Sequence, residues 1–312
     1  MPTRDAATAL TVLVPDDRGL TALADAAGVA AVRYEPGSAW PADHHDAEVV
    51  VVGYEAADAV GARFHELPAL RLVQTLNAGY EQWLPYLPDG VILSNGRGAH
   101  GGSTAEWVVA VLLAIYRDLA AFAAHHAAGQ WRPAVTDTLL GKRVVVLGAG
   151  DLATNLAARL VPFEVDVTLV GRSARPGVRA MADVHALLPR ADVLVSMLPN
   201  DASTHHVVDA AFLAALPDRA IVVNAGRGTA VDPEALLTEL RAGRLRAALD
   251  VTEPEPLPPD HPLWTAPGLL LTPHVAGSTA GAWDRAWVVA RRQIEAYLRG
   301  DVPPNAVAGV TA

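Results

Sequence analysis

Short runs of valine, leucine and isoleucine alternate with helix-like stretches along the whole chain of 312 residues. Buried strands that alternate with helices predict parallel sheets with crossover connections, so we expect an α/β protein. The second series of runs contains six strands, the number that a doubly wound dinucleotide-binding sheet needs. The predicted strands cover residues 10–14, 48–52, 70–75 and 91–94, and then 144–148, 165–170, 193–197, 221–224, 247–251 and 269–272.

Two Rossmann-like domains follow from this order. A long helical segment, 103–124, and the stretch GQWRP separate the two series, and a last helix, 280–299, comes after the second sheet is complete. That helix is expected to return to the first domain. We predict a flavodoxin-like substrate-binding domain, residues 1–102 and 280–312, into which an NAD(P)-binding domain with a doubly wound parallel sheet, residues 103–279, is inserted. A chain that is 51% hydrophobic is long enough for both cores.

The composition excludes several classes of partner. The net charge is -10 and no block rich in lysine or arginine occurs, which argues against nucleic acid. The absence of cysteine excludes disulfides and thiolate metal sites. No signal peptide is recognisable at the N-terminus, and the apolar stretch 107–116 is too short to cross a bilayer. We expect a cytoplasmic location, no membrane partner and no metal.

A glycine-rich loop follows the first strand of the second series. After VVVLG the chain continues Gly148-Ala149-Gly150-Asp151-Leu152-Ala153, a GxGxxA pattern between a strand and a helix. Gly148 permits the tight turn, Gly150 leaves room for a pyrophosphate, and the small Ala153 lets helix and strand pack closely. The N–H groups at the start of the helix are then available to bind phosphate. A dinucleotide cofactor is predicted, although the same glycines also occur in ordinary turns.

The residues after the next strand indicate which dinucleotide is bound. An acidic residue usually stands there to accept hydrogen bonds from the adenosine ribose of NAD, but this chain has Gly171, Arg172 and Ser173. The glycine removes a charge that would repel a 2′-phosphate, and the arginine can bind one. NADP(H) is therefore favoured and NAD(H) remains possible. The alternative is that Arg172 and Arg175 are solvated loop residues.

Three side chains suited to reducing a keto acid follow successive strands of the second series: Arg227, Glu255 and His274. Negative charge grows on a keto oxygen as its carbon accepts hydride, so a guanidinium can stabilise it and an imidazolium can donate a proton. A carboxylate bonded to the imidazole favours its charged form. Each residue alone has a simpler structural explanation. Together, at the carboxyl ends of one sheet where ligands bind in such folds, they predict catalysis.

These segments resemble the D-isomer-specific 2-hydroxyacid dehydrogenase family, in particular its glyoxylate/hydroxypyruvate reductases. The resemblance is carried by QTLNAGYEQW, STAEWVVAVLLAIYR, the glycine-rich loop, SMLPNDASTHHVV, NAGRG, EPEPL and TPHVAGST. It implies that Arg227 binds the substrate, His274 is the acid/base, and Glu255 supports His274. It also implies a homodimer and reduction of a small 2-keto acid such as glyoxylate or hydroxypyruvate to the D-2-hydroxy acid.

The resemblance assigns the remaining site positions as well. The loop Asn77, Ala78 and Gly79 is expected to bind the substrate carboxylate through its backbone, beside Arg227 and His274. The expected cofactor contacts are Thr104, Gly148, Gly150, Asp151, Leu152, Gly171, Arg172, Ser173, Leu198, Pro199, Thr204, Asn224, Ala225, Gly226, Asp250, His274 and Gly277.

Other assignments stay open on the sequence alone. Met197 replaces a histidine common in the family, and Ala153 replaces the third glycine. Phosphoglycerate and phosphite dehydrogenases are alternatives, and dinucleotide-binding corepressors, which act through protein contacts, come from a different class. Formate dehydrogenases fit less well because a glutamine usually replaces Glu255. The paired histidines 44–45, 125–126 and 205–206 are expected on the surface, because neighbouring side chains diverge and no acidic ligand cluster accompanies them.

Overall fold

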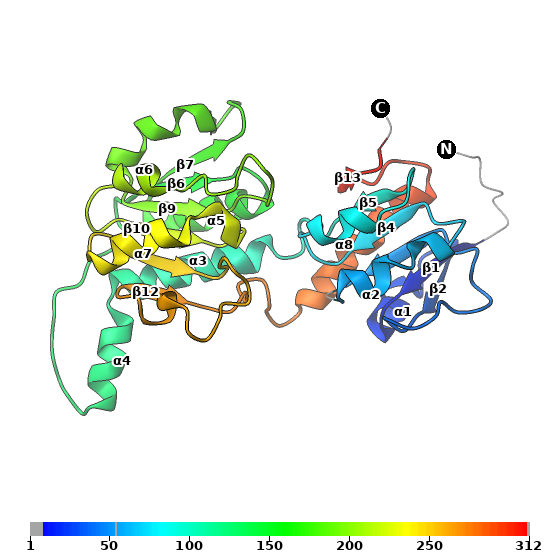
Figure 1. Cartoon of the computed structure of the whole chain (residues 1–312), viewed down its shortest axis with the longest axis horizontal. Helices are drawn as coiled ribbons and strands as arrows, with labels where there is room; N and C mark the ends of the chain where they lie inside the picture. The colour runs from blue at the N-terminus through cyan, green and yellow to red at the C-terminus, as the bar shows by residue number, and fades with distance from the viewer. Residues whose placement is uncertain (1–8, 54, 311–312) are drawn as a thin grey trace. The chain divides into compact units, whose positions relative to one another are not determined.

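A computed structural model describes residues 9–53 and 55–310 of the chain. The chain divides into two compact units, one formed by the segment up to His100 with the segment from Ala280 onwards, the other by Gly101–Thr279. The first boundary lies two residues before the predicted one, because the helix that opens the second unit, α3 (Gly101–Tyr116), begins at Gly101. Figure 1 labels many of the elements of both units.

The first unit contains a sheet with strand order β13-β5-β4-β3-β1-β2. All pairs are parallel except β13 with β5, so the first five strands have the flavodoxin-like order. Helix α8 (Ala282–Leu298) packs on one face through Trp287 and Ile294, beside α1 (Asp17–Leu23). The other face is covered around α2 (Ala57–Gly61) by a core that includes Phe64 and Trp83. The strands are β1 (Leu10–Val14), β2 (Val29–Arg33), β3 (Val49–Val52), β4 (Leu72–Thr75), β5 (Ile92–Ser94) and β13 (Ala306–Ala308).

The second unit contains a wholly parallel sheet with strand order β12-β11-β10-β9-β6-β7-β8. This is the doubly wound order of dinucleotide-binding sheets with one further strand. One face is covered by α3 and α5 (Asp151–Leu160), and the other by α6 (Ala210–Ala214) and α7 (Pro233–Arg241). The strands are β6 (Arg143–Leu147), β7 (Asp166–Gly171), β8 (Val178–Ala180), β9 (Val193–Ser196), β10 (Ile221–Asn224), β11 (Arg246–Leu249) and β12 (Leu269–Leu271).

Three strands and one helix break differ from the sequence prediction. Strands β2, β8 and β13 were not predicted; each lies at an edge of its sheet, and none of their described residues is fully buried, so they lack a long apolar run. The predicted helix 103–124 is two helices, α3 and α4 (Leu119–Ala127). The chain breaks at Asp118, whose φ of 49° is left-handed and cannot continue a right-handed helix.

Among the described residues, no single helix is long and apolar enough to cross a membrane. Helices α3 and α4 reach the necessary length only when taken together, and they are bent by 64° at their junction.

Candidate active site

The three predicted catalytic residues follow three neighbouring parallel strands of the second unit. Strands β10 and β11 pair in parallel with Asn224 opposite Leu249, and β11 and β12 pair with Leu249 opposite Leu271. Parallel strands therefore end at the same edge of the sheet, and the loops that carry Arg227, Glu255 and His274 begin there side by side.

His274 and Glu255 are joined by a short hydrogen bond. The distance between Nδ1 of His274 and Oε1 of Glu255 is 2.5 Å, and the two side chains are 54% and 40% exposed. Because the carboxylate engages Nδ1, that nitrogen carries the proton and Nε2 is left to face a substrate. The pair has the arrangement of an acid/base histidine oriented by a carboxylate.

A buried carboxylate holds the turn that presents His274. Asp250, at 3% exposure, accepts through Oδ1 from the hydroxyl of Thr272 (2.6 Å) and the N–H of Val275 (2.9 Å). Its Oδ2 accepts from the N–H of Ala276 (2.9 Å), and the N–H of His274 donates to its backbone oxygen (2.7 Å). His274 has a φ of 54°, a left-handed conformation that persists in non-glycine residues where surrounding contacts impose it. Asp250 was predicted as a nicotinamide contact; its carboxylate is already engaged in positioning this turn.

The loop of Arg227 is fixed by its own backbone. The side-chain amide of Asn224 donates to the carbonyl of Arg227 (2.9 Å), and its oxygen accepts from the N–H of Gly226 (3.2 Å). At Gly228 an added Cβ would overlap the carbonyl oxygen of Thr252, so the loop of Arg227 packs directly on the segment that leads to Glu255. The guanidinium of Arg227 is half-buried and donates to the carbonyl of Gly226 (2.9 Å).

A hollow of about 310 Å³ lies beside the His274–Glu255 pair. Its size fits a small ligand group rather than a whole dinucleotide. The lining residues come from the segment between β11 and β12, the end of β12 and the loop after it: Asp250, Thr252, Glu255, Pro256, Leu257, Trp264, Leu271, Thr272, Pro273 and His274.

The glycine-rich loop has the geometry that a pyrophosphate requires. Gly148 has a φ of 118°, which glycine adopts readily, and a Cβ there would press on the carbonyl of Met197. A Cβ on Gly150 would meet nothing within 4 Å, so the space in front of the loop is open. The N–H groups of Gly150, Asp151 and Leu152 donate to no other described residue. The residues therefore fit the phosphates of a dinucleotide at the N-terminus of α5.

The side chain of Asp151 turns away from that space. Its Oδ1 accepts from the amide of Asn155 (3.0 Å), and its Oδ2 is buried where a Cβ of Gly101 would collide with it. Only its backbone N–H is therefore placed toward a phosphate.

Two arginines lie at the end of β7, where the adenosine ribose is expected. A Cβ on Gly171 would approach Val178 to 3.0 Å and the guanidinium of Arg175 to 3.3 Å, so a larger acidic residue has little room. Arg175 donates to the carbonyl of Ala149 (2.9 Å), while Arg172 is 86% exposed and lies 3.4 Å from the carboxylate of Asp201. Ser173 is exposed beside it.

Asp201 is an acidic neighbour that the sequence did not single out. Hydrogen bonds from the hydroxyl and the N–H of Ser203 hold the pKa of the Asp201 carboxyl below its usual range, with a smaller contribution from the charge of Arg172. The carboxylate therefore stays charged and competes with a bound phosphate for Arg172.

The other predicted cofactor positions lie in the same unit. Thr104 is buried on α3, and Leu198 is buried after β9. The hydroxyl of Thr204 donates to the carbonyl of Pro199 (2.7 Å), which closes the loop after β9. Ala225 is buried after β10, and Gly277 follows the turn that Asp250 holds.

In the first unit, the loop after β4 presents backbone N–H groups. The N–H groups of Asn77, Ala78 and Gly79 donate to no other described residue, while the carbonyls of Asn77 and Ala78 accept from Gly96 (2.8 Å) and Asn95 (2.8 Å). Successive unpaired N–H groups suit a carboxylate.

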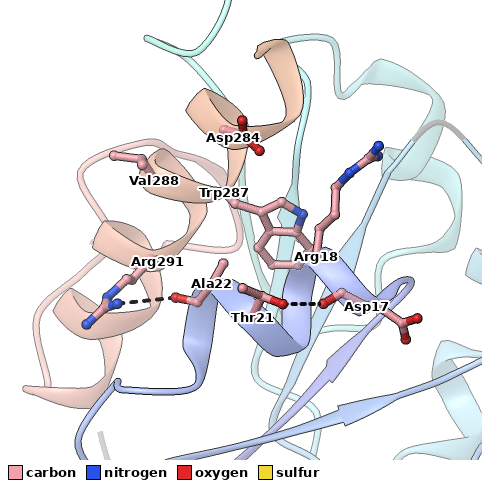
Figure 2. Close-up of a pocket in the computed structure, with 8 residues that line it drawn as sticks. All are labelled: Asp17, Arg18, Thr21, Ala22, Asp284, Trp287, Val288 and Arg291. Carbon is pink, nitrogen blue, oxygen red and sulfur yellow. Dashed lines mark hydrogen bonds between the residues drawn. The ribbon is translucent and has the colours of Figure 1, made fainter. Parts of the chain in front are cut away.

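A second hollow, of about 460 Å³, lies in a groove between α1 and α8 of the first unit (Figure 2). Two of its polar side chains are paired: Arg291 donates to the carbonyl of Ala22 (3.2 Å), and Thr21 donates to the carbonyl of Asp17 (3.0 Å). None of the predicted site residues lines it.

One pair of histidines has a carboxylate neighbour that the sequence analysis did not expect. Nε2 of His206 lies 2.7 Å from Oε2 of Glu253, and Nε2 of His205 lies 3.7 Å from Oε1. Glu253 is distant in sequence, and the left-handed φ of His206, 48°, turns the two rings onto the same side of the chain. Neither the proximity of Glu253 nor the left-handed φ of His206 can be predicted from the spacing of residues in the sequence.

Comparison with known proteins places the chain in a family. Residues 109–276 match the model of the family described as D-isomer specific 2-hydroxyacid dehydrogenase, NAD binding domain. Glyoxylate reductase of Thermofilum pendens is 30% identical to this chain. The alignment covers 77% of this chain and 75% of the relative.

Two solved structures share the fold over nearly the whole chain. A D-isomer specific 2-hydroxyacid dehydrogenase from Xanthobacter autotrophicus, in complex with NADPH and MES, has a TM-score of 0.83 and 27% identity, with 96% of this chain and 100% of that chain covered. An NADPH-dependent glyoxylate/hydroxypyruvate reductase from Sinorhizobium meliloti, in complex with NADP and sulfate, has a TM-score of 0.79 and 30% identity, with 96% and 98% covered.

Replacing Asp250 tests its role in holding the turn of His274. In Asp250→Asn one of the two acceptor oxygens becomes a donor that faces a backbone N–H, so we expect a loss of about 2 to 4 kcal/mol in the free energy of unfolding. We also expect a lower kcat. Urea unfolding and steady-state kinetics measure both, with Asp166→Asn, an exposed residue of β7, as the control. Wild-type stability and kcat in Asp250→Asn would contradict the proposed positioning.

Proposed function

Because the chain belongs to the D-isomer-specific 2-hydroxyacid dehydrogenase family, we propose that it reduces a small 2-keto acid, such as glyoxylate or hydroxypyruvate, to the D-2-hydroxy acid. The observation that carries this proposal is the 2.5 Å bond between His274 and Glu255 at the edge of the sheet where Arg227 also lies.

Each side chain has a defined task in the proposed reaction. When bound, a nicotinamide dinucleotide supplies the hydride. The imidazolium form of His274 donates its Nε2 proton to the keto oxygen and becomes neutral, and Glu255 holds Nδ1 so that Nε2 faces the substrate. Arg227 stabilises the negative charge that develops on the same oxygen. The N–H groups of Asn77, Ala78 and Gly79 are proposed to bind the substrate carboxylate.

A panel of 2-keto acids with both nicotinamide cofactors tests the reaction. We expect the oxidation of NADPH to be fastest with glyoxylate or hydroxypyruvate, the substrates named for similar proteins. Phosphoglycerate and phosphite are tested with the oxidised cofactors, by the formation of NADH or NADPH, since both alternatives fit the triad. If no substrate is turned over while nucleotide binding is intact, the protein is a dinucleotide-dependent binding protein instead.

Single substitutions test the three catalytic roles. We expect His274→Ala and Arg227→Ala to lower kcat by about 10²- to 10⁴-fold, because each removes a group that acts on the keto oxygen. The dissociation constant of the nucleotide, measured by protein fluorescence, should change little. Suitable controls are His45→Ala and Arg241→Ala, which alter exposed residues of the same types. A near-normal kcat in either active-site variant would refute its role.

We further propose that NADP(H) is preferred over NAD(H). At Gly171 there is little room for the acidic residue that would favour NAD, and the exposed guanidinium of Arg172 lies beside the end of β7. The two structural relatives were solved in complex with NADPH and with NADP, which supports a preference for NADP(H).

Arg172→Ala tests the preference directly. We expect the KM for NADPH to rise about tenfold or more, since a charge-assisted hydrogen bond contributes about 1.5 to 3 kcal/mol, while the KM for NADH changes little. Arg179→Ala, an exposed arginine on the neighbouring strand β8, serves as the matched control. An equal rise in both KM values, or a wild-type preference for NADH, would contradict the proposal.

Two copies are proposed to associate through the arm formed by residues 117–137 of the second unit. Helix α4 within this arm has no buried residue, and Trp131 and Val135 are fully or almost fully exposed. Figure 1 shows the arm extending away from the sheet of its unit. An exposed tryptophan on a projecting segment suits a homodimer contact. Light scattering should report the mass of a dimer, and a monomer after Trp131→Ser with Val135→Ser; a monomeric wild type would exclude the contact.

A further inference from the structure

Two imidazoles and one carboxylate converge on the surface of the second unit. Nε2 of His206 is 2.7 Å from Oε2 of Glu253, and Nε2 of His205 is 3.7 Å from Oε1. The two rings stack with centroids 4.0 Å apart and planes inclined by 28°. One ligand atom from each residue lies within 4.8 Å of the other two. Three potential metal ligands therefore point into one small volume.

The backbone holds these side chains in place. The N–H of His206 donates to the carbonyl of Thr229 (2.7 Å), and the N–H of Val208 donates to the carbonyl of Ala230 (3.0 Å). The segment of Glu253 is held on the other side, where Gly228 packs against the carbonyl of Thr252. A site that is already assembled costs less ordering of the chain when an ion binds.

We propose that His205, His206 and Glu253 bind one divalent transition-metal ion of the zinc type. Ligand bonds of about 2.0 to 2.2 Å in a tetrahedral site place ligand atoms roughly 3.4 Å apart. The observed distances of 2.7 and 3.7 Å lie on either side of that value, so small side-chain rotations suffice. Imidazole nitrogens favour zinc, nickel or copper over magnesium or calcium. Two histidines and one glutamate provide three ligands of a tetrahedral site and leave the fourth coordination position for water. All three side chains are partly exposed, so the ion can reach the site from solvent.

A plain ion pair between His206 and Glu253 would explain less of the geometry. One histidine is enough for an ion pair, but here the second imidazole points its Nε2 at the other oxygen of the same carboxylate. Binding of the ion does not depend on the redox reaction, although Glu253 is close in sequence to Glu255. Because protons compete for the imidazole nitrogens, binding should weaken as the pH falls.

Metal titration of the full chain without an affinity tag tests the site. Zinc alone is titrated by calorimetry, and cobalt alone is followed by its visible absorption, which reports a tetrahedral site. We expect a single equivalent to bind the wild type. His205→Ala and Glu253→Gln should each weaken zinc binding by more than about tenfold. The loss of a residue that only hydrogen-bonds a metal ligand already lowers metal affinity by about tenfold or more, and these variants remove a ligand itself. Glutamine keeps the size of the side chain and a hydrogen-bond acceptor, and circular dichroism checks that both variants fold.

Two control variants separate this site from other histidines. His125→Ala with His126→Ala removes an adjacent pair on α4, and His274→Ala removes the other histidine bonded to a glutamate. Both should bind zinc like the wild type. The proposal is overturned if the wild type shows no saturable binding, if Glu253→Gln and His205→Ala bind as tightly as the wild type, or if binding is lost only in His274→Ala.

Discussion

The parallel pairing of β10, β11 and β12 is the constraint on which the candidate site depends. Their register places Asn224, Leu249 and Leu271 in one row, so the loops behind them start at neighbouring points. Adjacent strands lie about 4.8 Å apart, a spacing that side chains of arginine, glutamate and histidine can bridge. The three functional groups come together because of strand order. Along the chain, 27 residues lie between Arg227 and Glu255, and 18 lie between Glu255 and His274.

Two kinds of carboxylate contact in this site have different physical roles. Asp250 is buried and accepts three hydrogen bonds, so its removal leaves backbone N–H groups without partners and costs stability. The bond between Glu255 and His274 is half-exposed, and an exposed pair contributes about 1 kcal/mol or less to folding. Its contribution to the fold is therefore small. Orientation of the imidazole is the better explanation for a carboxylate in that position.

The sequence predicts most of the fold because its central strands are continuous apolar runs. Strands β2, β8 and β13 escape prediction because edge strands need no such run. The break at Asp118 lies within a sequence that is apolar and helix-forming on both sides, so only the left-handed φ reveals it. The triple Arg227, Glu255 and His274 is predictable from residue types behind strands. The anchoring role of Asp250 is not, because it depends on where backbone N–H groups of a later turn come to lie.

The histidine cluster shows most clearly what spacing cannot predict. In a strand, neighbouring side chains point to opposite faces, and in a helix they diverge by about 100°, so adjacent histidines are not expected to share a ligand. A single left-handed residue removes that restriction. His206 adopts this conformation, at a cost of order 1 to 3 kcal/mol, because its N–H is held by the carbonyl of Thr229. The hydrogen bonds of the loop after β10 therefore determine the geometry of His206 as well as that of Arg227, and one rigid backbone segment supports both groups of side chains.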